Sequence, residues 1–419
     1  LVSESITPWE NDLVSHDATT KEYVVINSTK GHLKEAIAAA NKDYTKIKNL
    51  KITGEISAQD FYFMRDSMEN LAALNLKEVI IRGGEQRLTG GAQGVYPHND
   101  YEIPYEALRG KKSLNLLVLP DKLTKIGIAA FADDQNITGS LIIPEGVTEI
   151  EVGAFYDCRS MNGTLSLPST LKYLGRGIDL WWYGGVFTYC GFTSELILPN
   201  NLECIAGNNT FAGCEGLHGE LRFPEKLTEI SDGAFNGCKS LTGSITIPQG
   251  VHKLPTSVFQ FCDNLNGTLT LPDGITSIGY NCFQGCALKG ELKLPKNLTV
   301  IADEVFNGCD FSGELVLPKT IRSIGKRAFA NNWRLMGIVE FPEGLQSIGA
   351  GAFANCRMIE GLVFPESLES IRAENSYNED GGAFQGCYGI NSIVCKSDMP
   401  AYVPVSYTHL RAHETEADL

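Results

Sequence analysis

Residues 219–243 read GELRFPEKLTEISDGAFNGCKSLTG, and this stretch contains the pattern that decides the fold. Its apolar skeleton is Leu221, Phe223, Pro224, Leu227, Ile230, Ala234, Phe235, Cys238 and Leu241. The next stretch repeats it as Ile245, Ile247, Pro248, Val251, Leu254, Val258, Phe259, Cys262 and Leu265. A fixed self-similarity of this length indicates a solenoid, because each repeat can bury its apolar face only against its neighbours.

The repeat extends over most of the chain. Prolines recur at positions 120, 144, 168, 199, 224, 248, 272, 295, 318, 342 and 365, and nine of the ten intervals are 23–25 residues long. A phenylalanine follows each proline, at positions 131, 155, 187, 211, 235, 259, 283, 306, 329, 353 and 384. A degenerate repeat around Ile103, Leu108 and Leu114 precedes them. The pattern predicts a β-rich solenoid of about 11–12 coils, in which each Gly-x-Leu-x-Leu-Pro segment is a short strand ended by its proline.

The repeats resemble the BspA-like leucine-rich repeats, a proline-containing bacterial subclass with Leu-x-Leu-Pro, Leu-x-x-Ile-Gly and Ala-Phe-x-x-Cys segments. The resemblance covers Leu76 to about Pro404. It implies a leucine-rich-repeat superhelix. It also implies an exported or surface-attached protein of host-associated bacteria that acts as an adhesin or as a binding module for host matrix and other cells.

Composition and motifs narrow the function classes. The net charge of −15 argues against nucleic acid and anionic membrane surfaces as partners, and no apolar run is long enough to span a bilayer. The chain contains no His-Glu-x-x-His, Gly-x-Ser-x-Gly or phosphate-binding loop. Carboxylates are plentiful, so a glycosidase pair is not excluded by counting. We expect a non-enzymatic protein without a cofactor.

Nine of the twelve cysteines occupy the Phe-x-x-Cys position of a repeat, which Asp134 and Asn332 fill in two others. Cys204, Cys282 and Cys395 lie outside it. Metal or disulfide chemistry is the functional alternative, but zinc-ligand spacing is absent. We therefore predict a ladder of buried free thiols, because a free cysteine packs as a small hydrophobe.

The flanking segments have other patterns. We interpret residues 1–21 as a disordered lead-in or linker and residues 22–75 as a small α/β N-terminal cap that covers the first coil. Within this cap, Ser57 precedes a predicted helix and Asp60 stands in the capping-box position. Residues 76–404 form the predicted solenoid, in which residues 82–100 read as a mobile Gly-rich surface loop. Residues 405–419 break the repeat and look like translated sequencing-adapter sequence.

Two eight-residue insertions fall at the same phase of the coil, so we expect them at the same edge of the solenoid. The first contains Trp181, Trp182 and Tyr183, and the second contains Tyr377, Glu379 and Asp380. Adjacent aromatic side chains suit stacking on a sugar or anchoring a protein partner. The alternative is that these tryptophans fold back on the solenoid. The acidic insertion lacks an EF-hand pattern but has the side chains of a calcium ligand.

The residue two positions before each proline is expected to point outward from the strands. Polar members of this row and their neighbours form a candidate sheet platform, namely Glu220, Arg222, Thr246, Thr270 and Lys293. Such a row is either an ordinary solvated face or a broad platform for a protein partner.

These features together predict a non-catalytic exported binding protein, located in the medium or at the cell surface, that recognises host or microbial proteins. The alternatives are a glycan-binding surface protein that uses Trp181–Tyr183 and a structural spacer for another domain.

Overall fold

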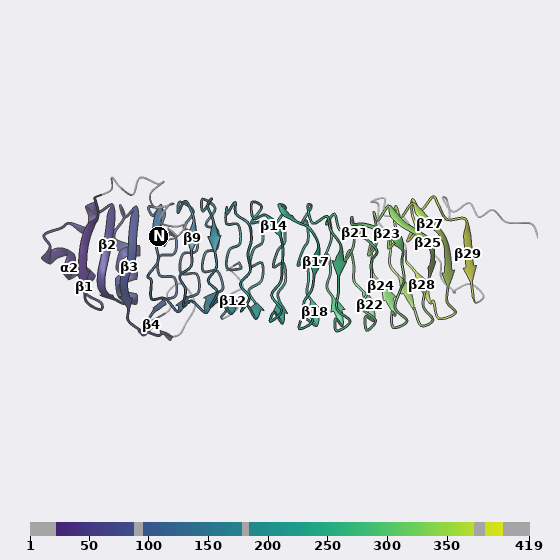
Figure 1. The fold of residues 1–419 in the computed structure, drawn as a ribbon, viewed down its shortest axis with the longest axis horizontal. Helices are drawn as coiled ribbons and strands as arrows, with labels where there is room; N and C mark the ends of the chain where they lie inside the picture. The colour runs from purple at the N-terminus through teal and green to yellow at the C-terminus, as the bar shows by residue number, and fades with distance from the viewer. Residues whose placement is uncertain (1–21, 88–94, 178–183, 373–381, 397–419) are drawn as a thin grey trace, which may run out of the picture. The chain divides into compact units, whose positions relative to one another are not determined.

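A computed structural model describes residues 22–87, 95–177, 184–372 and 382–396. The chain is a β-solenoid of about 14 turns. It divides into two compact units, Leu1–His218 and Gly219–Leu419. Figure 1 draws the described residues in colour from the N-terminus to the C-terminus. Three predicted features lie outside the described residues. They are the lead-in, the 405–419 tail and the two insertions, one of which is aromatic and the other acidic. The solenoid prediction is confirmed; the structure has about 14 turns, against the predicted 11–12 coils and a separate N-terminal cap.

The extra turns come from the N-terminal α/β segment of the first unit. Its strands β1 (Val24–Ser28), β2 (Asn49–Ile56) and β3 (Ala73–Ile81) are parallel, and β7 (Leu116–Val118) continues the same sheet. Helix α2 (Leu33–Ala39), the short 3-10 helix η1 (Tyr44–Lys46) and helix α3 (Ala58–Ser67) connect these strands. The segment therefore adds solenoid turns that contain helices. The strands of these turns belong to the same parallel sheet that the repeats continue.

Asp60 joins the turns of this segment. Its buried carboxylate accepts the backbone N–H of Ser57 at 2.8 Å, as the capping box predicts, and so fixes the start of α3. It also accepts the N–H groups of Gly31 at 2.8 Å and Leu33 at 2.9 Å. One carboxylate thus ties the loop after β1 to the helix after β2.

The interpretation of residues 82–100 as a mobile loop is wrong at its two ends. Strands β4 (Gly84–Arg87) and β5 (Val95–His98) form an antiparallel hairpin. Asp100 holds the base of the hairpin, because it accepts the N–H of Gly83 at 2.8 Å and pairs with Arg82 at 2.7 Å. Backbone pairing and this ion pair order the two described ends of a segment that glycine content alone marks as loose.

The remaining coils of the first unit contribute two rows of very short parallel strands. One row includes β9 and β11, and the other runs β6-β8-β10-β12-β13. Their bounds are β6 (Glu102–Ile103), β8 (Lys125–Ile126), β9 (Leu141–Ile142), β10 (Glu149–Glu151), β11 (Leu165–Ser166), β12 (Tyr173–Arg176) and β13 (Cys204–Ile205).

The second unit has the same two rows. The Leu-x-Leu-Pro row and the segment just before it contain β14 (Gly219–Glu220), β16 (Leu241–Thr242), β17 (Ile245–Thr246), β19 (Leu269–Thr270), β21 (Lys289–Gly290), β23 (Asp310–Glu314), β25 (Arg334–Glu340), β27 (Met358–Phe364) and β29 (Ser392–Cys395). The x-Ile-Gly row contains β15 (Glu229–Ile230), β18 (Lys253–Leu254), β20 (Ser277–Ile278), β22 (Val300–Ile301), β24 (Ser323–Ile324), β26 (Ser347–Ile348) and β28 (Ser370–Ile371). Each pairing that joins two strands of these rows is parallel, as expected when successive coils stack in the same direction.

Stacked phenylalanines form the core of each unit. In the first unit, the ring centroids of Phe131, Phe155, Phe187 and Phe211 lie 5.2, 5.8 and 5.5 Å apart in sequence order. In the second unit, the rings of Phe235 to Phe384 continue at 5.2–5.7 Å. The two insertions lie in the sequence between Phe155 and Phe187 and between Phe353 and Phe384. Both of these pairs still stack, so the extra residues leave the ladder intact.

The cysteines form a second ladder beside the phenylalanines. The thiol of Cys262 donates to the backbone oxygen of Phe235 in the preceding coil at 3.1 Å, and Cys286 donates to that of Phe259 at 3.0 Å. Asn332 replaces cysteine in its coil, and its Nδ2 donates to the oxygen of Phe306 at 2.8 Å. All twelve cysteines are free thiols, eleven of them buried, as the sequence predicts.

We expect a thiol-specific reagent such as DTNB to label one cysteine of the native protein rapidly and all twelve in denaturant. Only the thiolate reacts, and burial raises the pKa of Cys214 and of Cys262 to about 12. Cys395 is exposed. In a Cys395→Ser variant the rapid phase should disappear; rapid labelling of several native thiols would contradict the ladder.

Candidate functional site

All five residues of the predicted sheet platform lie in the second unit and are exposed. Thr246 on β17 and Thr270 on β19 are direct partners in register, and Lys293 bridges to Val316 on the next coil. Arg222 pairs with Glu220 at 2.7 Å, two residues away in its own coil. The structure therefore places these side chains on neighbouring coils of one face, where their hydroxyl and charged groups contact solvent.

An apolar row continues this face toward the C-terminal coils. Val316, Met336, Ile338 and Met358 have exposed fractions of 69, 39, 56 and 46 %. Met336 and Met358 are direct partners between β25 and β27. Glu314, the partner of Met336, and Glu340 are exposed beside them. Four large apolar side chains in contact with water on adjacent coils are unusual for a face that serves only to be solvated.

The six predicted ligand-binding residues of the insertions, Trp181, Trp182, Tyr183, Tyr377, Glu379 and Asp380, lie outside the described residues. Their role stays a prediction.

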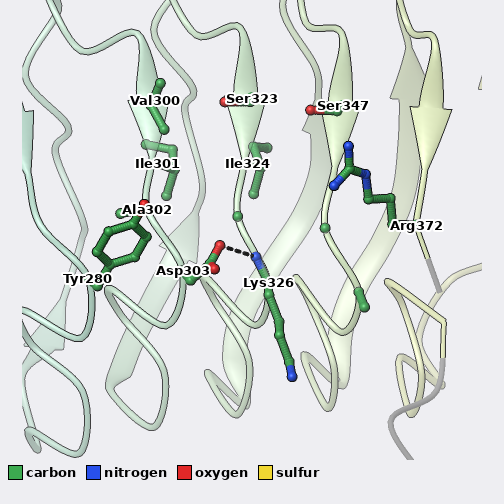
Figure 2. Close-up of a pocket in the computed structure, with 13 residues that line it drawn as sticks. Tyr280, Val300, Ile301, Ala302, Asp303, Ser323, Ile324, Lys326, Ser347 and Arg372 are labelled. Carbon is green, nitrogen blue, oxygen red and sulfur yellow. Dashed lines mark hydrogen bonds between the residues drawn. The ribbon is translucent and has the colours of Figure 1, made fainter. Parts of the chain in front are cut away.

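A groove that the sequence analysis missed lies on the x-Ile-Gly row of the second unit. It has a volume of about 390 Å³ and extends over the coils from Tyr280 to Arg372 (Figure 2). Strands β22, β24, β26 and β28 lie in this order beneath it. Ser323 and Ser347 are partners in register on β24 and β26, and both line the groove.

Small residues line the hollow, and the glycines among them let successive coils approach closely. The positions that follow the isoleucine of each strand are Ala302, Gly325 and Gly349, with Ala350 behind them. A Cβ added to Gly349 would stand 2.5 Å from the backbone nitrogen of Lys326. Larger residues at Tyr280 and Arg372 border the hollow at its two ends (Figure 2). The sequence has Ser323 and Ser347 at this position of two consecutive repeats, but they become meaningful only when the two positions are known to share one strand row.

The described lining of the groove contains few ionisable groups. Asp303 is the one carboxylate among its described lining residues, and its Oδ1 accepts the backbone N–H of Lys326 at 2.8 Å. A glycosidase needs two carboxylates that flank one bond. The described residues contain no group of three or more side chains that could hold a metal ion.

The family model described as BspA type leucine rich repeat region matches the chain in six copies, over residues 101–178, 183–312, 266–381 and 312–402. The chain belongs to this family, and the resemblance in the sequence is confirmed. No curated protein matches the chain.

Solved structures of bacterial proteins resemble the chain as well. A leucine rich cell surface protein from Faecalibacterium prausnitzii A2-165 is 20 % identical, over 94 % of this chain and 86 % of that one, with a TM-score of 0.40. A leucine-rich repeat protein from Bacteroides ovatus ATCC 8483 is 21 % identical, over 89 % of this chain and 94 % of that one, with a TM-score of 0.43. In the part of the chain that the structure describes, no helix has the length and apolar character needed to cross a membrane.

Proposed function

We propose that this chain is a non-catalytic binding protein, exported to the cell surface or beyond it, whose outward sheet face binds a protein partner of host or microbial origin. One observation carries the proposal, namely the exposed row Val316, Met336, Ile338 and Met358 on the second unit. Exposed apolar patches with a polar surround mark protein interaction sites. The platform residues Thr246, Thr270 and Lys293 supply that polar surround on the neighbouring coils.

Membership in a family of repeat proteins supports a binding role, because a solenoid offers a long surface for recognition. The cell-surface location given for the Faecalibacterium prausnitzii protein motivates the proposed location. Cell fractionation of the organism that produces the protein tests the proposed location directly. Recovery of the protein in the cytosol would remove the proposal of an exported adhesin.

The binding face is tested by Ile338→Glu, which places a charge in the centre of the apolar row. We expect binding to immobilised, purified host matrix proteins to weaken about tenfold or more, since buried apolar anchors dominate interface energies. The matched control is Val25→Glu, because Val25 is 59 % exposed on a strand of the first unit. Equal binding by both variants and the unmodified protein would exclude this face as the interface.

A further inference from the structure

The groove between Tyr280 and Arg372 has no role in the proposed protein interface, since it lies on the other strand row (Figure 2). We propose that it binds an oligosaccharide that bears acidic groups, such as uronate or sulfate. The site would take the sugar chain across successive coils, with Tyr280 at one end, Lys326 in the middle and Arg372 at the other end. Its volume of about 390 Å³ is in the range of ligand sites, about 300–1,000 Å³.

Charge separates this groove from the rest of the protein. The whole chain has a net charge of −15, whereas the described lining residues contain two cations, Lys326 and Arg372, and one carboxylate, Asp303. One oxygen of that carboxylate is already engaged by the backbone N–H of Lys326. Arg372, whose side chain is exposed, offers a positive charge at one end of the groove, which favours an anionic ligand over a neutral one.

The arrangement of the groove favours a sugar over an extended peptide. A peptide strand binds a sheet by pairing with free main-chain groups at an edge. Here β24 pairs with β22 and β26, and β26 pairs with β24 and β28, so the strands beneath the centre of the groove have partners on both sides. Recognition must use side chains instead.

The available side chains match a carbohydrate. The ring of Tyr280 is 57 % exposed, and an aromatic face of this kind packs against the apolar face of a sugar ring. The hydroxyls of Ser323 and Ser347 stand in register between the two ends and can exchange hydrogen bonds with sugar hydroxyls. Arg372 presents a planar guanidinium suited to a carboxylate or sulfate.

This inference names a ligand class for a second site of the proposed binding protein and depends on other residues than the protein interface does. The groove proposal and the protein-interface proposal can therefore be rejected independently of each other. Ile338→Glu should leave glycan binding unchanged, and the groove variants should leave binding to matrix proteins unchanged.

The experiment measures binding of the full chain, by isothermal titration or biosensor, to four defined probes. They are an oligogalacturonate tetrasaccharide, its neutral methyl ester, a chondroitin sulfate tetrasaccharide and its desulfated form. We expect at least one charged probe to bind about tenfold or more tightly than its matched counterpart, and its affinity to fall with added salt. Arg372→Ala and Tyr280→Ala should each reduce that affinity about tenfold, whereas Arg372→Lys should retain part of it.

Tyr388→Ala is the matched control, because Tyr388 is 77 % exposed in the same unit and does not line the groove. A poly-glutamate peptide is included as a fifth probe. Equal affinity for charged and neutral sugars, binding that survives both groove substitutions, or no binding of any acidic sugar at millimolar concentration overturns the proposal. Tight binding of the peptide that depends on Arg372 would assign the groove to an acidic protein segment and would equally overturn it.

Discussion

Replacing Phe283 by alanine is expected to lower the free energy of unfolding of the second unit by about 3–5 kcal/mol. Phe283 is fully buried, and its ring stacks between Phe259 at 5.3 Å and Phe306 at 5.7 Å. Truncation removes both contacts and leaves a cavity. The neighbouring rings cannot fill it, because each is held by its own coil and by the next ring in the ladder.

Hydrogen exchange is the appropriate measurement for this variant. Unfolding of a long repeat array is often not two-state, so one midpoint does not define a free energy. We expect faster exchange to be centred on the amides of the coils around residue 283, since each coil contacts only its neighbours. Thr270→Ala, on the exposed face of the same unit, should change stability by less than about 0.5 kcal/mol. A loss of less than about 1 kcal/mol for Phe283→Ala would contradict the role of the ladder.

The success of the sequence in predicting this core has a simple physical origin. A solenoid core depends on which residues return at a fixed spacing, and that spacing is visible without knowledge of distant contacts. Phe259, Phe283 and Phe306 are neighbours in space because they occupy the same position in consecutive repeats. The cysteine ladder could be predicted for the same reason.

The groove could not be predicted in this way. Its floor lies on strands of two residues each, such as β24 and β26, and an alternation of apolar and polar residues cannot be recognised over so short a length. Two residues of its lining, Gly325 and Gly349, also stand where a Cβ would meet the backbone of the preceding coil. Only the coil geometry shows that they stand beside Asp303 and Lys326.

The N-terminal segment illustrates a third case. Its strands and helices follow from local patterns, but the register in which β2 pairs with β3 depends on contacts across the sheet. The structure pairs Asn49 with Ala73 and Leu50 with Leu74. Local propensity contains no information on this choice.

Asp134 is the one ionisable carboxyl among the described residues that replace cysteine in the ladder, and we expect Asp134→Asn to stabilise the protein by about 1–3 kcal/mol at neutral pH. Asp134 is fully buried; its Oδ1 accepts the backbone N–H of Lys111, and its Oδ2 has no partner in the described residues. Burial raises the pKa of this carboxyl well above its usual value. Asn332 occupies the equivalent position of another coil, where its amide donates to the oxygens of Phe306 and Phe329.

The pH dependence distinguishes a buried charge from a simple packing effect. Because the pKa of Asp134 is raised in the folded state, protonation stabilises the fold; this contribution is complete below the unfolded pKa of about 3.9 and is lost as the pH rises through the folded pKa. The advantage of Asp134→Asn should therefore be small near pH 4 and grow toward pH 7. Lys111 and Asp133, the charged neighbours that act on this carboxyl, are present in both proteins, so the difference between the two urea titrations isolates position 134. A difference that stays constant between pH 4 and pH 7 would mean that the carboxylate is reached by water and that its burial has no cost.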